Sequence, residues 1–287
     1  MPTLSRPLCG MRGRLCALAA AALPAAVAAQ AAPDAAPPEP PPRTVQGYVI
    51  GAALVDGRDP VGQSARTSTL QPVWGLWVGR FRLSSGGAAT LWGVGREALV
   101  DAGLSTTLVR RSNASLSASL RWDEGRETDE DDPLLRGASP VRGTLRGRLS
   151  LGYAPAPRWS LSLGVSQDLL GRAGGAQVSA GLSYRHPVSA RTHWDLGGSI
   201  RAGNTTYLRT VYGLSPPAAA RVGRQPYEPS AGAEAVQLDW RLVSALDRDW
   251  VVYGGVGVSR LVGAAARSPL VGARQVWSAQ IGLAYRH

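Results

Sequence analysis

The stretch Ala114-Ser-Leu-Ser-Ala-Ser-Leu-Arg-Trp122 alternates apolar and polar residues without a break. Alanine, leucine and tryptophan hold the even positions, whereas serine and arginine hold the odd ones. A period of two predicts a β-strand with one apolar and one polar face. The same alternation returns further along the chain, at 159–168, 176–185, 194–200, 236–242 and 277–286. The sequence therefore predicts an all-β protein.

A soluble sandwich would also alternate, but three features favour a membrane. The polar face is small and hydrophilic, and Phe81 is the single phenylalanine, which argues against a thick aromatic core. The strand lengths match the ~9–11 residues of a tilted membrane strand, and no segment after the N-terminal region approaches ~18 consecutive apolar residues. Aromatic residues lie near predicted strand ends, where interfacial girdles place them, at Trp122, Tyr153, Trp159, Tyr184, Trp194, Trp250 and Tyr285. These features predict an antiparallel transmembrane β-barrel.

The alternation predicts about twelve strands, with ten as the alternative count. We place them at 45–55, 69–83, 88–97, 101–111, 114–122, 140–154, 157–170, 173–186, 190–202, 232–245, 248–261 and 273–287. The pattern is weakest over 88–111, where Gly93, Gly95 and Asp101 blur it. Tight turns are expected at 84–87, 154–157, 186–191 and 247–249, and long connections at 56–68, 123–139, 203–231 and 262–272. With the N-terminus in the periplasm, the turns are periplasmic and the long loops extracellular.

Residues 1–29 are predicted to be a signal peptide for export. Arg6, Arg12 and Arg14 form its positive region, and an apolar run from 15 to 28 follows. That run is shorter than the ~20 residues of a spanning helix, which favours a cleaved signal over the alternative, a retained anchor. Residues 30–44, rich in alanine and proline, are predicted to be a periplasmic lead-in, and 45–287 to be the barrel.

Both cysteines, Cys9 and Cys16, lie in the predicted signal peptide. The mature chain would then contain no cysteine, which excludes thiolate catalysis and thiolate metal binding. The chain is basic, with 31 Lys+Arg against 20 Asp+Glu, and all the positive residues are arginines. They are scattered singly along strands and loops, which is typical of a polar lumen or of contact with anionic lipid and disfavours nucleic acid.

Catalytic and metal-binding patterns are sparse. His186 and His193 flank one predicted periplasmic turn, and a metal site there would need Asp195, although zinc usually takes three or four assembled ligands. Interfacial histidines at a strand end are the ordinary interpretation. A lipid hydrolase would need a Ser–His pair near the outer rim, opposite these histidines. The acidic run 123–132 lacks the spacing of a calcium loop, and we interpret it as a solvated loop. The chain is therefore predicted to be no enzyme and to hold no cofactor or metal.

The predicted loop 203–231 is the most informative functional segment, because a loop of this length is usually functional or disordered and its aromatic residues argue against disorder. Two placements are open: folded into the lumen as a constriction, or displayed outside for contact. In either, its arginines would line a basic vestibule that favours anionic solutes. The candidate contact residues are Arg201, Tyr207, Arg209, Tyr212, Arg221, Arg224 and Tyr227.

The second half of the chain carries longer motifs. They are Tyr207-Leu-Arg-Thr-Val-Tyr-Gly-Leu-Ser215, Tyr227-Glu-Pro-Ser-Ala-Gly232, the stretch 260–271 with Arg260, Ser268 and Pro269, and the ending Ile281-Gly-Leu-Ala-Tyr-Arg286. With Gly79-Arg80-Phe81 and parts of 125–137, they make the chain resemble the MipA/OmpV family of outer-membrane proteins. Barrels of this kind commonly end in phenylalanine, whereas this chain ends in His287, on the same face as Tyr285.

The resemblance implies a location in the bacterial outer membrane, surrounded by outer-membrane lipid. It also implies a non-enzymatic scaffold that joins a murein polymerase to a lytic transglycosylase. Other members of the family are treated as porin-like or adhesion-related, so a narrow porin-like channel is the alternative function.

Overall fold

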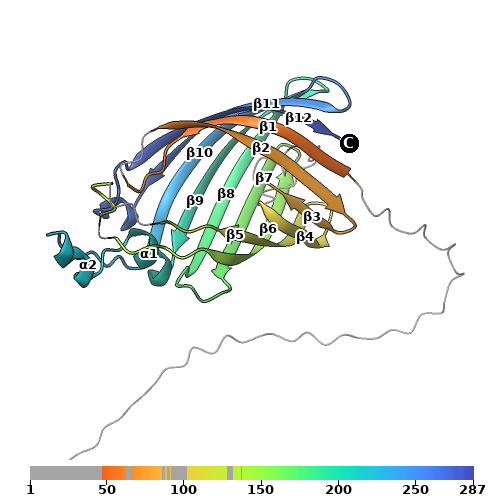
Figure 1. Cartoon of the computed structure of the whole chain (residues 1–287). Coiled ribbons are helices and arrows are strands. Elements are labelled where there is room, and N and C mark those ends of the chain that lie inside the picture. The colour runs from red at the N-terminus through yellow and green to blue at the C-terminus, as the bar shows by residue number, and fades with distance from the viewer. Residues whose placement is uncertain are drawn as a thin grey trace, which may run out of the picture. The chain divides into compact units, whose positions relative to one another are not determined.

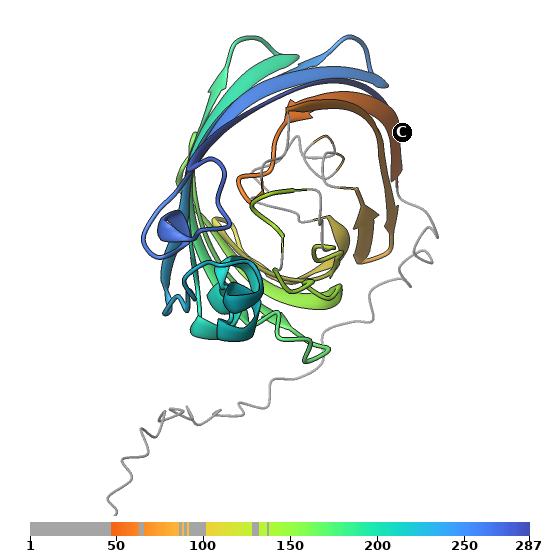
Figure 2. The same cartoon turned by 60° about the vertical axis from the view of Figure 1, so that its left-hand side comes forward.

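In the part of the chain that the structure describes, twelve strands form one closed antiparallel barrel, in which each strand pairs with its sequence neighbours and β1 pairs with β12 (Figures 1 and 2). This computed structural model describes residues 47–62, 66–85, 88, 91, 102–127, 132–136 and 138–287. The strands are β1 (Gly47–Gly57), β2 (Thr67–Val78), β3 (Phe81–Ser84), β4 (Gly103–Arg110), β5 (Ala114–Asp123), β6 (Thr144–Ala156), β7 (Trp159–Asp168), β8 (Ala176–Pro187), β9 (Thr192–Gly203), β10 (Gly232–Ala245), β11 (Trp250–Leu261) and β12 (Gln275–Arg286). The predicted antiparallel barrel of about twelve strands is confirmed.

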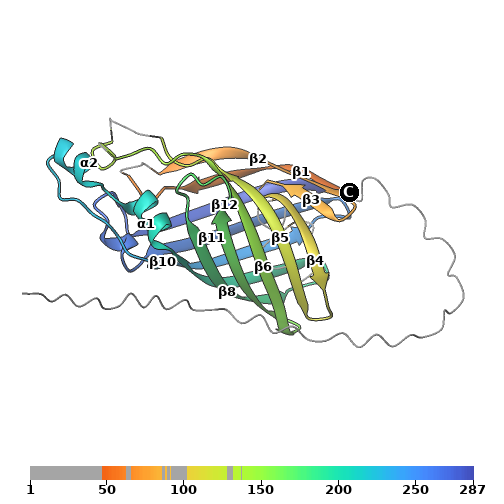
Figure 3. The same ribbon diagram turned by 90° about the horizontal axis from the view of Figure 1, so that it is seen from below.

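Long and short connections lie at opposite ends of the barrel. Tight turns at 79–80, 111–113, 157–158, 188–191 and 246–249 form what we call the turn end. Longer connections at 58–66, 85–102, 124–143, 169–175, 204–231 and 262–274 form the loop end, where α1 and α2 lie in Figure 3. The barrel begins at the turn end, and the chain ends there too (Figure 1). The predicted asymmetry of connections is therefore confirmed.

The outer surface of the barrel is apolar. Large side chains at outward positions are exposed, among them Leu163 at 56%, Trp277 at 58% and Ile281 at 59%. In β7 the inward positions, which alternate with the outward ones, are serine, glycine and aspartate. A soluble protein seldom exposes so much contiguous apolar surface, whereas the lipid-facing side of a membrane barrel requires it. The alternation seen in the sequence thus separates a lipid-facing surface from a polar lumen.

The predicted strand 69–83 is wrong as a single strand. The chain turns at Gly79-Arg80, so that β2 and β3 form a hairpin. Gly79 adopts a φ of +58°, a left-handed conformation that costs glycine little. The tight turn expected at 84–87 is also wrong, since Ser84 ends β3 and a loop-end connection begins there. The extra hairpin keeps the strand count at twelve.

Parts of the predictions lie outside the described residues, namely the signal peptide 1–29, the lead-in 30–44 and most of the predicted strand 88–97. Of that strand, the structure describes only Ala88 and Leu91, and neither is in a strand. Both are buried, at 0% and 2% exposure. The prediction of a strand at these two residues is therefore wrong.

The inner surface of the barrel has two kinds of wall. From β5 to β10 its inward positions are mostly serine, glycine and arginine. On the other side, small apolar residues of β1, β2, β10, β11 and β12 enclose Ala88 and Leu91. The Arg286 guanidinium donates to the Leu91 carbonyl at 3.4 Å. Ala88 and Leu91 thus lie inside the lumen, against its apolar wall.

Aromatic rings surround the turn end. Trp159, Tyr184 and Trp194 follow one another at centroid distances of 4.9 and 5.8 Å. At the seam between β1 and β12, the rings of Tyr48 and His287 lie 5.6 Å apart, and their backbones exchange hydrogen bonds of 3.1 and 3.0 Å. His287 therefore pairs with β1 at the seam and adds a planar ring to the girdle.

Candidate functional site

Two short helices follow β9 at the loop end. Asn204 caps α1 (Thr205–Tyr212) by accepting the Tyr207 N–H at 2.9 Å. The second helix, α2 (Pro216–Arg221), begins with proline, whose missing N–H is harmless in a first turn. The sequence predicts a loop over 203–231, and the two helices within it are a difference from that prediction. In the described part of the chain, no helix is long and apolar enough to cross a membrane.

The connections of the loop end pack into a small hydrophobic core of their own. The core draws on the connections 58–66, 124–143, 204–231 and 262–274 and on the ends of β10 and β11. Leu208, Leu214 and Leu270 are at most 1% exposed. The short 3-10 helix η2 (Ala265–Arg267) contributes a fully buried Ala265. The loop end is therefore a folded cap.

A buried carboxylate lies beneath this cap. Glu234 is 3% exposed and sits at a β-bulge of β10, where one extra residue redirects the side chain. Its Oε1 accepts hydrogen bonds from the hydroxyls of Tyr207 and Tyr212, each at 2.9 Å. Its Oε2 lies 3.5 Å from the Gln177 amide and 3.9 Å from Arg201 Nε. The carboxylate thus ties α1 to three strands of the wall.

The same carboxylate changes the acidity of the two tyrosines. Burial raises the pKa of the Tyr207 hydroxyl, and the nearby Glu234 charge raises it further. Burial and Glu234 raise the pKa of Tyr212 in the same way. Both phenols therefore stay protonated near neutral pH and keep donating to the carboxylate.

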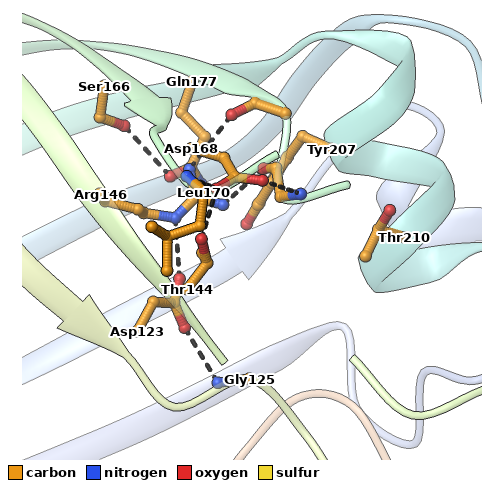
Figure 4. A network of polar contacts seen from close by, with 12 residues as sticks. Asp123, Gly125, Thr144, Arg146, Ser166, Asp168, Leu170, Gln177, Tyr207 and Thr210 are labelled. Atoms are coloured by element: carbon orange, nitrogen blue, oxygen red, sulfur yellow. Dashed lines mark hydrogen bonds and ion pairs between the residues drawn. The ribbon is translucent and has the colours of Figure 1, made fainter. Parts of the chain in front are cut away.

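A second polar network joins α1 to β5, β6 and β7 (Figure 4). Arg146 is 4% exposed, and its guanidinium donates to Asp123 at 2.8 Å and to the Gly174 carbonyl at 2.6 Å. It also lies 5.3 Å from the centroid of the Tyr207 ring, within cation–π range. Next to it, Thr144 at the start of β6 donates to Asp168 at the end of the neighbouring strand β7. A buried arginine with these partners holds the strand ends and the helix in one arrangement.

The connection 169–175 is strained and tightly held. Ala173 has a φ of +62°, which is unfavourable for a residue with a side chain. The carbonyl of Ala173 accepts a hydrogen bond from Thr210 of α1 at 2.7 Å, and Asp168 accepts the Gly174 N–H at 2.9 Å. A Cβ on Gly175 would lie 2.4 Å from the backbone nitrogen of Tyr207, so only glycine fits there.

Two arginines link the connection 124–143 to the helical segment. Arg126 donates to the Val211 carbonyl at 3.0 Å, and burial lowers the pKa of its guanidinium. Arg224 donates to the Leu134 carbonyl at 3.0 Å. Because both bonds join residues far apart in sequence, they fix one connection of the cap against the other.

The structure separates the predicted contact residues. Tyr207 and Tyr212 are buried beneath the cap, and Arg224 lies against the connection 124–143. Arg209 is exposed and pairs with Glu228 at 3.2 Å, and Arg221 is exposed at the end of α2. Arg201 lies in the barrel wall near Glu234. The basic vestibule stays a prediction.

The stretch 260–271 also belongs to the cap, with Arg260 at its edge and Ser268 and Pro269 within it. The Ser268 hydroxyl donates to the Tyr212 carbonyl at 2.7 Å and accepts the N–H of Leu270 at 3.1 Å. Pro269 lies between these two buried residues, whereas Arg260 is exposed at the end of β11. The Tyr227 hydroxyl donates to the Ala264 carbonyl at 2.7 Å. Most of the motif therefore serves the packing of the loop end.

The two histidines of the hairpin β8–β9 face opposite sides of the sheet. His186 stacks on Trp194 in the outer girdle, with ring centroids 5.0 Å apart. His193 points inward and lies 3.7 Å from Asp195, which also binds Arg185 at 2.7 Å. The two rings therefore do not approach each other across the turn. Within the described residues, no three His, Cys, Asp or Glu side chains gather into a metal-binding group.

The fold and the motif residues agree with one protein family. The model of the family described as MltA-interacting protein MipA matches residues 50–287, which is nearly the whole barrel. The chain belongs to the MipA family. A closed barrel with an apolar outer surface is the form that outer-membrane proteins take, so this member of the family is an outer-membrane protein.

Solved structures show low similarity to the chain. An outer-membrane channel from Pseudomonas putida F1 is 12% identical, with a TM-score of 0.41 and coverage of 88% of this chain and 100% of that one. The porin NanC is 8% identical, with a TM-score of 0.38, and the match covers 83% of this chain and 98% of the porin. A FadL homologue from Pseudomonas aeruginosa is 11% identical, with a TM-score of 0.38, and the match covers 84% of this chain and 89% of the homologue. Among curated proteins, none matches the chain significantly.

The sequence does not predict the roles of Glu234 and Arg146, the buried polar residues that tie the cap to the barrel wall. Both lie on strands, and their partners come from connections more than twenty residues away. One signal was present, since Asn204 followed by Thr-Thr-Tyr is a typical helix start. It would have revealed α1 but not the side of the barrel on which α1 packs.

Proposed function

We propose that the barrel is a non-enzymatic scaffold of the outer membrane, which brings a murein-synthesising enzyme and a lytic transglycosylase together. The single observation that carries this proposal is the family match over residues 50–287, since the family is described by its interaction with MltA. Two buried polar clusters at the loop end, around Glu234 and Arg146, tie the cap to the barrel wall. A scaffold needs such a rigid frame and an accessible contact surface.

The turn end supplies a suitable contact surface. Each of its five turns exposes an arginine: Arg80, Arg111, Arg158, Arg191 and Arg248. The only acidic residues in those turns are Asp247 and Asp249, which lie together in 246–249. In outer-membrane barrels the short turns face the periplasm, where murein and its enzymes are. A basic rim of this kind attracts and orients an acidic partner surface.

Two neighbouring turns also expose apolar side chains. Val188 is 59% exposed and Leu246 is 55% exposed. The turns are joined, because Ala245 donates to the Arg191 carbonyl at 2.9 Å and the Arg191 guanidinium to the Leu246 carbonyl at 3.4 Å. We call Val188, Arg191, Leu246 and Arg248 the docking patch. An apolar centre with a polar rim is the usual anatomy of a protein interface.

Capture from a periplasmic extract tests the scaffold. The full barrel in detergent micelles should recover a murein polymerase or a lytic transglycosylase, and the double variant Val188→Asp/Leu246→Asp should recover neither. Ala220→Asp, an exposed position on α2 at the other end, is the matched control and should capture like the wild type. If the folded wild-type barrel recovers neither enzyme, the scaffold proposal fails.

A narrow channel is the second candidate function, and the polar wall of the lumen favours it. Arg148, Arg185 and Arg241 lie on inward positions among serines and glycines of β6 to β10. The burial of Ala88 and Leu91 inside the barrel argues against a wide pore, because these residues occupy part of the lumen. In a planar bilayer a channel should give small, discrete, anion-selective conductance steps, and a silent bilayer containing folded barrels would exclude it.

A further inference from the structure

An apolar groove crosses the outer face of the barrel between β3 and β7. It has a volume of about 450 Å³, within the ~300–1,000 Å³ range of ligand sites. Three small outward residues, Thr106, Ala118 and Gly147, form its floor on β4, β5 and β6. Its walls are larger apolar side chains, namely Phe81, Leu104, Leu120, Leu149, Val165 and Leu169. Large residues around small ones produce the hollow.

The walls of this groove belong to the lipid-facing surface. Leu149 and Val165 are each 54% exposed, and Leu169 is 53% exposed. Leu169 leans across Gly147, where an added Cβ would meet its side chain at 3.0 Å. Since the groove opens toward the hydrocarbon of the bilayer, the ligand that reaches it in the membrane is an acyl chain.

The loop-end edge of the groove is polar and aromatic. Gln167 lines it from β7, and Trp122 follows Leu120 on the outward face of β5. The guanidinium of Arg172 lies 5.9 Å from the Trp122 ring centroid and donates to the Gly143 carbonyl at 2.6 Å. An arginine has five N–H donors, so one such bond leaves capacity for a phosphate. Tryptophan and arginine are also residues that favour the headgroup level of a membrane.

We propose that this groove binds one acyl chain of an anionic, phosphate-bearing membrane lipid, with the lipid phosphate at Arg172. The apolar floor selects a hydrocarbon chain, and Gln167, Trp122 and Arg172 lie on the side toward the loop end, where the headgroup of that leaflet would be. The bound lipid fills a hollow that the barrel's own side chains leave open. It thereby covers the wall next to the short strand β3.

Native mass spectrometry with phosphatidylglycerol tests the site. The full barrel in micelles is titrated with this lipid, and the complexes that survive detergent removal are counted. Ala118→Phe fills the groove and should lose the one retained lipid. Ala180→Phe is the matched control, because Ala180 is also a half-buried, outward-facing alanine in mid-strand but lies on β8 outside the groove. Arg172→Ala should reduce the preference for phosphatidylglycerol over phosphatidylcholine by about fivefold.

A second measurement uses the wild-type barrel alone and so does not depend on the folding of a variant. Phosphatidylglycerol with a photoreactive acyl chain should label peptides from 145–170 more strongly than the outward positions of β9 and β10. Even labelling around the barrel would overturn the site, as would equal lipid retention by Ala118→Phe and the wild type. Occupation of the groove by a second copy of the barrel, seen as a crosslinked dimer through this face, would also overturn it.

Discussion

The two ends of the barrel are built on different principles. At the loop end, long connections share a buried core around Leu208, Leu214 and Leu270, and two polar networks tie them to the wall. At the turn end, two to four residues reverse the chain, and the arginines there are exposed. Packing therefore determines the shape of the loop end, whereas strand pairing determines that of the turn end. The turn end can change its surface chemistry at little structural cost, which suits an end that binds partners.

The largest effect should follow from a cavity in the cap. Leu208→Ala removes a fully buried side chain and should destabilise the loop end by about 2–5 kcal/mol. Arg248→Ala at the turn end should change the free energy of unfolding by less than about 0.5 kcal/mol. Hydrogen exchange of residues 204–231 measures the local loss of stability in Leu208→Ala. Urea unfolding in micelles measures the change in the free energy of unfolding in Arg248→Ala. Equal effects at both ends would contradict the comparison.

A smaller loss should follow from removal of the buried carboxylate. Glu234→Leu leaves the hydroxyls of Tyr207 and Tyr212 without their acceptor, at a cost of about 1–3 kcal/mol. Adding Tyr207→Phe and Tyr212→Phe removes the stranded hydroxyls and should restore part of that loss. Urea unfolding of Glu234→Leu, of Tyr207→Phe/Tyr212→Phe and of the combined variant gives the coupling. Strictly additive losses would show that the carboxylate and the tyrosines do not act together.

Alkaline pH should weaken the loop end through the same tyrosines. Their pKa is raised above the unfolded value of 10.0, so their contribution is complete below pH 10 and declines as the pH rises further. One pH unit above that value, each tyrosine should reduce stability by about 1.4 kcal/mol. Tyr207→Phe/Tyr212→Phe should flatten this dependence between pH 9 and 11. An unchanged slope in the double variant would exclude these two groups as its source.

The smallest effect should come from a turn. Asp247 accepts the N–H groups of Asp249 and Trp250 at 2.8 and 2.7 Å, and these bonds hold the pKa of its carboxyl below 3.8. Its contribution is present above pH 3.8 and is lost as the pH falls below it. Asp247→Ala should therefore slightly reduce stability at neutral pH and reduce its dependence on acid. Acid unfolding followed by tryptophan fluorescence measures it, and a loss as large as that of Leu208→Ala would contradict the comparison.

The sequence predicts the strands better than it predicts the site. Alternation locates β5, β7 and β8 because each has one lipid-facing side. The β2–β3 hairpin was not predicted. A signal for it is present, since the apolar residues stand at even positions at Trp74 and Leu76 but at an odd position at Phe81, which indicates a break between two strands. The cap could not be predicted, because Glu234 meets Tyr207 and Tyr212 only once α1 packs against the wall. Long-range packing of this kind leaves no periodic signal.

Whether the barrel presents its turn end to murein enzymes is measured by binding between purified proteins. A lytic transglycosylase is titrated onto the full barrel in nanodiscs at increasing salt. We expect saturable binding that weakens with salt, is abolished in Val188→Asp/Leu246→Asp and is unchanged in Ala220→Asp. Binding that does not depend on the docking patch and is lost in Ala220→Asp would overturn the scaffold proposal, as would no binding to the folded barrel.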